Sequence, residues 1–426
     1  MTDQKESLIE EGEDYIKKLG PGLITGAADD DPSGIATYSQ TGAQYGTSLL
    51  WLAAWTFPLM AIIQEMCARI ALVTGKGLAS NIKRTYSRGA LYFCTILLFI
   101  ANTLNIGADL GAIAKSIQLI IPSLSFIFLI VAVGLISLML QVYIPYKKYA
   151  HVLKWLVITL FSYVITGLII HMNWRELLYA GVMPQITFSK TQILLITGIL
   201  GTTISPYLFF WETSQEVEEQ ISEGKVTAHE RRGTNKAEIK KMRIDVWTGM
   251  FLSNLVMFFI IAVCANTLFI HGITNIATAS DAALALAPFA GKFASLLFMI
   301  GIIGTGMLAI PVLAGSTSYA LSESFGWKEG LYRKLSEARA FYAIISVSIA
   351  IGILLNFIGI DPIKALIYSA IANGIVAPVI IIFIVHISAS KKIMGHYKNS
   401  TLINIIGWII TLLMGITAIA AIYSLF

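Results

Sequence analysis

Three consecutive aspartates, Asp29 to Asp31, lie inside an otherwise apolar stretch and directly precede Pro32 and Gly34. A carboxylate within a membrane span is costly, and it is retained mainly where it pairs with a base, relays protons or binds a cation. No basic residue lies in the same stretch, so Asp31 is predicted to be a cation ligand. Because successive helical positions point in different directions, Asp29 and Asp30 are predicted to line the ion path. The alternative for these aspartates is helix capping.

Prolines interrupt two of the apolar stretches. Pro32 removes a backbone donor and, with Gly34, should break the first helix in mid-membrane. Pro206 is similarly placed in 191–211, where it follows the small and hydroxyl residues Gly201, Thr202, Thr203 and Ser205. Broken helices at matching positions of two inverted halves are the best sequence pointer to the substrate site of a transporter, because freed carbonyls and half-helix ends can coordinate an ion. The pattern predicts an ion site between the two breaks.

The elements that must position these residues are membrane spans. Charged residues make up 13% of the 426 residues and hydrophobic residues 56%, whereas about a quarter of a soluble protein is charged. Apolar runs of about 20 residues, the length that crosses a hydrocarbon core, predict eleven spans, approximately at 21–45, 48–74, 91–121, 123–143, 149–171, 191–211, 244–270, 282–321, 339–358, 364–388 and 402–425. The predicted fold is an all-α integral membrane protein with two inverted five-helix halves and an eleventh helix.

The distribution of basic residues predicts the orientation. They collect in every second connection, at 75–89, 147–154, 225–243, 328–339 and 391–398. By the positive-inside rule these connections and the N-terminus are cytoplasmic, in the plasma or inner membrane, and Phe426 is outside. The predicted divisions are a cytoplasmic N-terminal segment (1–20), a ten-helix core (21–388), and a cytoplasmic loop with the eleventh helix (389–426). The first segment lacks the features of a removable signal.

Further polar residues lie within the predicted spans. Asn102, Asn105 and Asp109 share one face of the third span, and Arg339, at the start of the ninth, is a candidate partner for Asp109 across helices. Lone Asn254 could be a ligand or could hydrogen-bond between helices.

Two other groups within the spans are expected to be structural. Glu65 and Arg69 are four residues apart in the second span and are expected to neutralise each other. The three cysteines, Cys67, Cys94 and Cys264, all lie in apolar runs and are expected to be buried and inert.

Several segments of the chain carry a family pattern. Gly20 to Gly22, Asp31 to Gly34 and Gly42 to Gln44 resemble GPG…DPGN…GAQ without a gap, and Gln64 to Ala79 is similar to QxLAARLGVVTGxxLA. Together with Ala314 to Leu331, these segments resemble the NRAMP family of divalent-metal transporters over nearly the whole chain. The resemblance implies a LeuT-type fold, with metal bound between the unwound parts of the first and sixth helices.

The departures from the family pattern fall on the implied metal site. Asp31 is retained, but Gly34 stands in place of a ligand asparagine, Ser205 in place of a methionine and Tyr207 in place of a histidine, while a family glutamate in the third helix is Ala112. The candidate metal ligands are Asp31, Gly34, Ala28, Thr202, Ser205, Gln64 and Asn373. The candidates for the ion path or for coupling are Asp29, Asp30, Asp109, Tyr207, Glu212 and Arg339.

These departures favour a hard cation as the cargo. A thioether suits transition metals, whereas hydroxyl and carboxylate oxygens suit magnesium, calcium and manganese. Magnesium sheds water reluctantly and is usually bound by one or two carboxylates with several waters retained, and small residues at 34 and 205 leave room for that shell. The pattern resembles a divergent branch of NRAMP-related magnesium transporters. We therefore expect secondary transport of Mg²⁺, with Mn²⁺ also accepted, by alternating access, and no bound cofactor.

Other functions remain as alternatives. One is a proton-coupled Mn²⁺ or Fe²⁺ transporter, although Tyr207 and Ala112 replace titratable family residues and only Glu212, one turn further on, could substitute. Another is a carrier of an organic substrate on the same fold, and three aspartates at the break argue against a carboxylate substrate. The sequence also leaves a passive channel open. No HExxH motif or serine with an adjacent base indicates an enzyme, no nucleic-acid partner is expected, and a monomer is compatible with the sequence.

Overall fold

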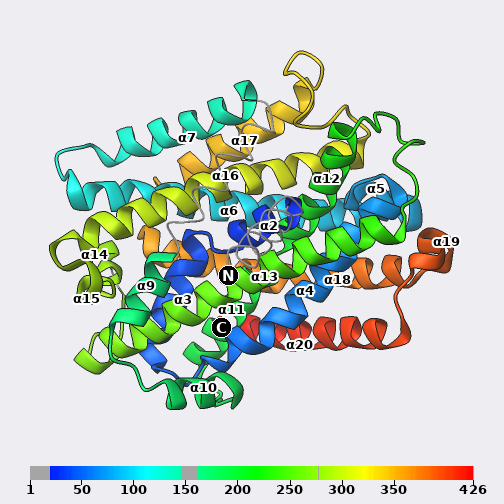
Figure 1. The fold of residues 1–426 in the computed structure, drawn as a ribbon. Helices are drawn as coiled ribbons and strands as arrows, with labels where there is room; N and C mark the ends of the chain where they lie inside the picture. The colour runs from blue at the N-terminus through cyan, green and yellow to red at the C-terminus, as the bar shows by residue number, and fades with distance from the viewer. Residues whose placement is uncertain (1–19, 145–160, 277, 426) are drawn as a thin grey trace, which may run out of the picture.

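The computed structural model describes residues 20–144, 161–276 and 278–425, and every regular element in these ranges is a helix (Figure 1). Eight helical segments there are long and apolar enough to cross a membrane. They are α4 (Trp51–Thr74), α6 (Arg88–Ile120), α7 (Phe126–Tyr143), α11 with α12 (Lys190–Thr203 and Pro206–Ser222), α13 (Lys236–Thr267), α16 (Ala294–Phe325), α18 (Pro362–Ala389) and α20 (Thr401–Leu425).

The remaining predicted spans correspond to shorter helices. The first is divided into α2 (Pro21–Asp29) and α3 (Pro32–Tyr45), and the ninth is α17 (Arg339–Leu355). The fifth is represented by α9 (Phe161–Ile169), since 149–160 lie outside the described residues. The basic residues near 147–154 and the N-terminal segment up to residue 19 also lie outside them.

Both predicted breaks are confirmed. α2 ends at Asp29 and α3 begins at Pro32, so Asp30 and Asp31 form the first interruption. α11 ends at Thr203 and α12 begins at Pro206, so Ile204 and Ser205 form the second. In each case the proline occupies the first position of the following helix, where its missing N–H costs nothing.

Several boundaries differ from the prediction. The eighth span, expected from residue 282, begins only at Ala294, after the short helices α14 (Ala279–Leu284) and α15 (Ala287–Ala290). Gly291 separates them from α16 with a positive φ of 50°. α12 continues to Ser222 rather than 211, and α13 begins at Lys236 rather than 244. The added turns are polar, so a hydropathy pattern does not reveal them.

Small residues let α2 lie directly against α13. A Cβ on Gly26 would lie 2.3 Å from the carbonyl carbon of Gly249, and one on Gly22 would lie 2.7 Å from the Cα of Val246. Such close backbone approach is typical of glycines spaced four apart on membrane helices. The carboxylate of Asp245 accepts hydrogen bonds from the backbone N–H groups of Gly20, Gly22 and Leu23. This contact fixes the start of α2.

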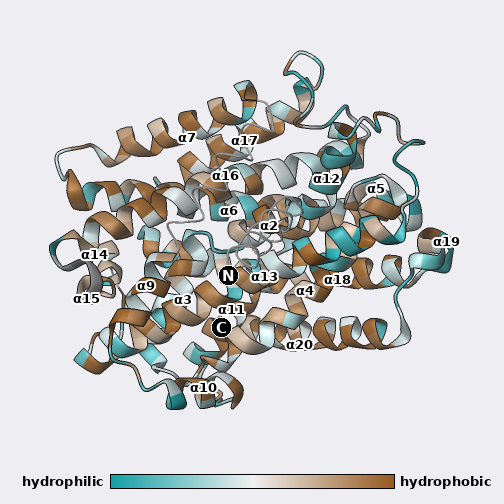
Figure 2. Ribbon diagram, viewed as in Figure 1, coloured by the Kyte–Doolittle hydropathy of each residue, from teal (hydrophilic) through white to brown (hydrophobic). Residues whose placement is uncertain are grey.

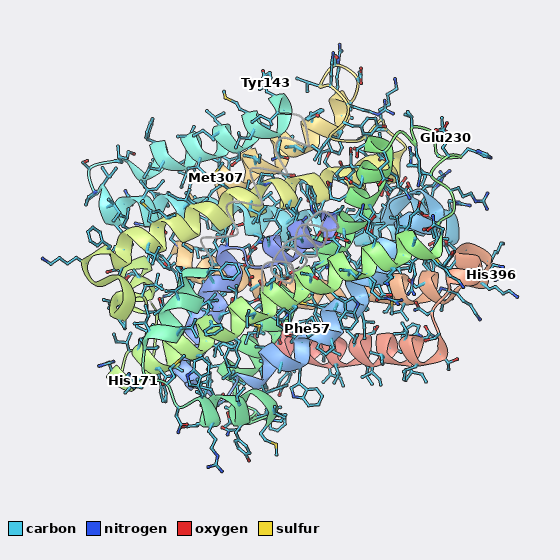
Figure 3. The ribbon with its side chains drawn as sticks, in the orientation of Figure 1. Phe57, Tyr143, His171, Glu230, Met307 and His396 are labelled. Carbon is cyan, nitrogen blue, oxygen red and sulfur yellow. The ribbon has the colours of Figure 1, made fainter. Side chains whose placement is uncertain are left out.

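The outer helices present apolar side chains, as a lipid-facing surface requires. In Figure 2 the outward faces of α7 and α20 are mostly brown, and the exposed large apolar residues include Phe128, Met139, Leu412 and Ile419. Polar segments gather at one end, with α5 (Leu78–Thr85), α19 (Lys391–Met394) and the α12–α13 connection. Figure 3 shows Glu230 and His396 at that end and His171 near the opposite one. α10 (Trp174–Val182) lies at the opposite end.

Candidate metal site

Asp31 is held at the first break by three hydrogen-bond donors. Its Oδ1 accepts from the backbone N–H of Gly34 at 2.7 Å and from the hydroxyl of Ser33 at 2.6 Å. Its Oδ2 accepts from Nδ2 of Asn105, on α6, at 2.7 Å. The side chain is fully buried. Asp31 therefore caps α3, as the capping alternative required, and it also places a carboxylate at the centre of the helix bundle.

The contact with Asn105 continues to a third helix. The hydroxyl of Ser369, on α18, donates to Oδ1 of Asn105 at 2.6 Å. The amide of Asn105 is thereby oriented, with its nitrogen toward Asp31. One chain of hydrogen bonds connects α3, α6 and α18 and holds the carboxylate in one position.

The second break places hydroxyl oxygens in the interior. The hydroxyl of Ser205 donates back to the end of α11, with Gly201 O at 2.6 Å and Thr202 O at 2.7 Å, which leaves its oxygen lone pairs available. Thr202 Oγ1 is buried beside the phenol of Tyr38 and makes no hydrogen bond of ordinary geometry among the described residues. Both residues are fully or almost fully buried. A buried hydroxyl without a well-formed hydrogen bond is costly, and a ligand at Thr202 would remove that cost.

The two breaks lie next to each other. The phenol of Tyr207 donates to the carbonyl oxygen of Ala28 at 2.9 Å. A Cβ on Gly34 would lie 3.0 Å from Thr202 Oγ1 and 3.3 Å from the carbonyl oxygen of Asp29. The hydroxyl of Thr202 therefore lies where a larger side chain at position 34 would begin.

α2, which precedes the first break, and α12, which follows the second, run antiparallel. Ala28 contacts Tyr207, while Thr25, one turn earlier in α2, donates to the carboxylate of Glu212, further along α12. This antiparallel pairing is the geometry expected of corresponding helices in inverted halves. Glu212 is fully buried, and its second oxygen has no hydrogen-bond partner in the described part of the chain.

Other candidate residues carry unpaired polar atoms. Asp30 and Asp109 are fully buried, and none of their carboxylate oxygens has a hydrogen-bond partner among described residues. Asp29 accepts from the hydroxyl of Ser253 at 2.6 Å through one oxygen, and the other is unpaired. The amides of Gln64 and Asn373 are likewise buried without partners. Buried polar groups without partners are rare, so these side chains in the spans are candidates to meet a polar ligand.

The expected pairing of Asp109 with Arg339 does not occur. Arg339 is exposed in the first turn of α17, while Asp109 lies fully buried in α6 with no hydrogen-bond partner in the described ranges. The sequence does not show that the arginine points to the surface.

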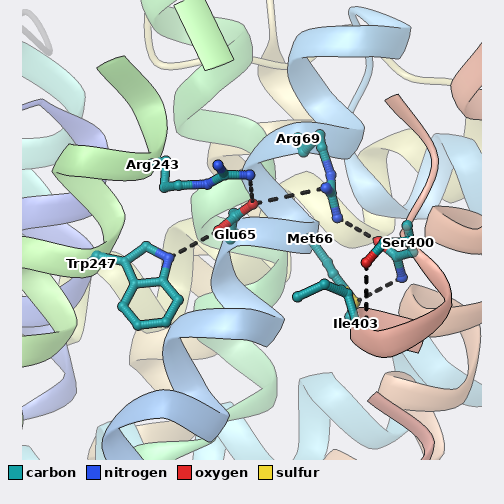
Figure 4. A network of polar contacts seen from close by, with 8 residues as sticks. Glu65, Met66, Arg69, Arg243, Trp247, Ser400 and Ile403 are labelled. Atoms are coloured by element: carbon teal, nitrogen blue, oxygen red, sulfur yellow. Dashed lines mark hydrogen bonds and ion pairs between the residues drawn. The ribbon is translucent and has the colours of Figure 1, made fainter. Parts of the chain in front are cut away.

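Of the two alternatives for Asn254, the structure shows the interhelical hydrogen bond, and the expected pairing of Glu65 with Arg69 is present beside a closer contact with Arg243. Asn254 accepts from the hydroxyl of Thr56 at 2.8 Å, so it joins α13 to α4. Glu65 accepts from Arg243 at 2.8 Å and from the indole of Trp247 at 2.9 Å, and it lies 3.8 Å from Arg69 (Figure 4). These groups are structural and do not belong to the site.

Sequence reasoning missed the residues that orient the aspartates. Ser33, Ser253 and Ser369 each donate to the network around the first break. Single serines in apolar helices are common, so no pattern identifies them. Asn105 could be found, since it shares a helix face with Asp109.

A family model described as natural resistance-associated macrophage protein-like matches residues 22–424. The chain belongs to the Nramp family. Among curated Nramp relatives, the divalent metal cation transporter MntH of Pectobacterium carotovorum subsp. carotovorum (strain PC1) is 25% identical over 404 residues, which cover 94% of this chain and 92% of the relative. The chain is thus a multi-pass membrane protein of a transporter family.

Solved structures show the same fold. A manganese transporter of Eremococcus coleocola, in complex with an aromatic bis-isothiourea compound, has a TM-score of 0.77 at 16% identity, over 96% of this chain and 87% of that one. Mhp1, a nucleobase-cation-symport-1 family transporter in a closed conformation, has a TM-score of 0.60 at 14% identity, over 95% and 92%. The Nramp chain therefore has the inverted-repeat fold expected from its two broken helices.

Within the described residues, no three His, Cys, Asp or Glu side chains come together as a group that could hold a metal ion. A cation at the breaks of this Nramp protein would therefore need neutral oxygens besides Asp31. Hydroxyl, carbonyl and amide oxygens of that kind are what Thr202, Ser205, Ala28 and Asn373 offer.

Proposed function

We propose that this Nramp protein is a secondary transporter of divalent cations that carries Mg²⁺ and also accepts Mn²⁺. Membership of the Nramp family supports divalent-metal transport, since its relative from Pectobacterium is named a divalent metal cation transporter. Alternating access would expose the region between the two breaks to each side of the membrane in turn. The family relatives are transporters, and we propose no enzymatic reaction.

The observation that carries the magnesium proposal is the contact of the two breaks at Gly34 and Thr202. The hydroxyl of Thr202, which lies beside Tyr38, is 3.0 Å from where a Cβ of residue 34 would be, on the same helix end that Asp31 caps. One carboxylate and a hydroxyl then face the same region. Hard oxygen ligands of this kind suit Mg²⁺, which needs few protein ligands because it retains waters.

The contact also changes the expected role of Gly34. The sequence suggested that a small residue at 34 leaves space for water. Thr202 occupies part of that space, so we assign to its hydroxyl the oxygen that an asparagine at 34 would have supplied. Ser205 remains the position where a small side chain leaves room.

Manganese coupled to protons is the second candidate, because the similar Eremococcus structure is that of a manganese transporter. Manganese also accepts oxygen ligands. Glu212, buried with one unpaired oxygen, is the group that we would assign to proton coupling in that case. Tyr207 is hydrogen-bonded to Ala28, so we assign it to the contact between α2 and α12 and not to proton coupling.

Reconstituted uptake with a simultaneous pH record separates the candidates. The purified protein is placed in liposomes containing a magnesium indicator or a manganese-quenched dye, together with a pH-sensitive dye. We expect saturable Mg²⁺ uptake, competition by Mn²⁺ and no acidification beyond that of empty liposomes. Uptake of Mn²⁺ with matched acidification and without Mg²⁺ uptake would overturn the proposal in favour of the second candidate. Non-saturating flux would indicate a channel.

We also propose that the end formed by α5, α19 and the α12–α13 connection faces the cytoplasm. Basic residues gather there, including Lys83, Arg84, Arg232 and Lys392. The positive-inside rule assigns such an end to the cytoplasm. The end of α20 at Leu425 is then extracytoplasmic.

A further inference from the structure

A cavity of about 240 Å³ opens at the end of the molecule that carries α5 and α19. None of the residues at the two breaks lines it. Its walls come from the end of α4, from α5, from the α12–α13 connection and from the start of α19 (Figure 1). The cationic side chains of its lining are Arg84, Arg232 and Lys392, and no acidic residue lines it.

The three cations have no ion-pair partner among the residues that the structure describes. Among described residues, the side chains of Arg84, Arg232 and Lys392 make no ion pair, in contrast to Arg243, which bonds to Glu65, and Lys225, which bonds to Glu238. Three exposed like charges around one cavity repel each other through solvent that screens them in part, and an anion bound between them offsets this cost. An unpaired cluster with no acidic lining therefore indicates an anionic ligand.

All three cationic side chains are exposed, and the backbone that carries two of them is tied to the bundle. Arg84 lies in the last turn of α5, whose C-cap residue Tyr86 contacts His386 of α18 through its hydroxyl. Arg232 precedes Gly233, whose N–H donates to the carbonyl oxygen of Val73 at the end of α4. Arg232 is therefore carried by a connection that is tied to the bundle.

The neutral polar residues of the lining differ in whether their side chains already hydrogen-bond within the protein. The hydroxyls of Thr74 and Thr85 donate to backbone carbonyls of their own helices, and the amide of Asn81 is bonded three times. Ser390 makes no side-chain hydrogen bond as the N-cap of α19. The cavity thus offers two guanidinium groups, one ammonium group and one hydroxyl.

We infer that this cavity binds the phosphate group of an anionic ligand at the cytoplasmic face. Guanidinium groups match phosphate oxygens in paired hydrogen bonds, and basic pockets between membrane helices on this side of a protein suit anionic lipid headgroups. A soluble phosphate compound presents the same chemistry. In either case the ligand joins α4 and α5 of the first half to the α12–α13 connection and to the start of α19.

Charge-matched variants test the site. The full-length protein carries Arg84→Gln, Arg232→Gln and Lys392→Gln together. The control carries Lys236→Gln, Lys240→Gln and Lys398→Gln, three exposed cations outside the cavity with the same loss of charge. A further variant, Ser390→Asp, keeps a good N-cap residue for α19 and adds a negative charge to the cavity.

Two probes separate the sources of phosphate. Native mass spectrometry counts phosphatidylglycerol retained by the protein against phosphatidylcholine. Calorimetry measures binding of inorganic pyrophosphate to the protein in phosphatidylcholine nanodiscs. We expect either phosphatidylglycerol or pyrophosphate to bind the triple variant more weakly, by roughly fivefold for each cation removed. The same probe should bind Ser390→Asp more weakly than the wild type, and its affinity for the control variant should be unchanged.

Loss of phosphatidylglycerol alone identifies a lipid site, and loss of pyrophosphate identifies a soluble ligand. Equal affinities in the triple variant and in the control, for both probes, overturn the inference. Because Ser390→Asp leaves all three cations in place, its result also checks that misfolding of the triple variant is not the cause.

Discussion

The hydroxyl of Tyr207 donates a hydrogen bond to the carbonyl oxygen of Ala28 at 2.9 Å, which joins the last turn of α2 to the first turn of α12. The two broken helices are therefore in direct contact at the level of the candidate site. Gly34 and Thr202 make the second close approach between the breaks. A substitution at one residue of either contact should therefore change the effect of a substitution at the other residue.

Gly34→Asn is expected to reduce Mg²⁺ uptake strongly, because its Cβ would lie 3.0 Å from Thr202 Oγ1 and 3.3 Å from the carbonyl oxygen of Asp29. Adding Thr202→Ala should recover part of the uptake, since the asparagine oxygen then replaces the hydroxyl. The coupling between the two substitutions should be on the order of 1 kcal/mol. Uptake rates of the two single variants and the double variant measure it, and strictly additive effects would contradict the contact.

Ser205→Met is expected to increase Cd²⁺ affinity and decrease Mg²⁺ uptake. A thioether binds soft ions and offers nothing to magnesium. Ser205→Ala is the control, because it removes the same hydroxyl without adding sulfur. Calorimetric titration with Cd²⁺ gives the answer: identical Cd²⁺ binding by the two variants would mean that residue 205 does not face the ion.

Gly26→Ala is expected to destabilise the protein by about 1–3 kcal/mol or more, the range for overpacking. Its new Cβ would lie 2.3 Å from the backbone of Gly249, where neither helix can yield easily. Gly415→Ala is the matched control in α20, because no atom lies within 4 Å of its Cβ position. Thermal unfolding in detergent measures both. A Gly26→Ala variant as stable as Gly415→Ala would show that α2 does not pack on α13 in this way.

Glu329, in the α16–α17 connection outside the spans, should make stability depend on pH. Burial, followed by the charges of Glu323 and Glu218, raises its pKa from 4.5 to about 9. The folded protein then binds more protons than the unfolded chain between these values, so this contribution to stability is full below the unfolded pKa and is lost as pH rises toward 9. Glu329→Gln removes the dependence.

The Glu329→Gln variant should therefore gain thermal stability over the wild type at about pH 8 and little at about pH 5. Glu337→Gln, exposed in the same connection, is the control. A difference between variant and wild type that stays constant with pH would contradict the burial of Glu329.

The sequence predicted the breaks because proline has a local and unconditional effect on a helix. Pro32 and Pro206 lack the N–H that continues a helix, wherever the chain folds. The hydropathy of the sequence also located the apolar part of most spans. It failed at the polar ends, as in the turns of α12 beyond Trp211, because a buried polar helix and a solvated one have the same hydropathy.

The partners of the site residues were less predictable. Asp31 could be found from its type and position, but Ser369 reaches it only through Asn105, and that chain depends on how α18 packs on α6. The pairing of Asp109 with Arg339 was wrong for the same reason. Which way a side chain points across helices is a tertiary property.

The most direct test of the account compares Mg²⁺ uptake by Asp31→Asn and Asp361→Asn in liposomes. Both aspartates are N-caps that precede a proline, at the starts of α3 and α18, and asparagine preserves capping while it removes the charge. The account predicts that Asp31→Asn folds but loses Mg²⁺ uptake, whereas Asp361→Asn transports like the wild type. Near-normal uptake by a folded Asp31→Asn variant would contradict the assignment of Asp31 as the cation ligand.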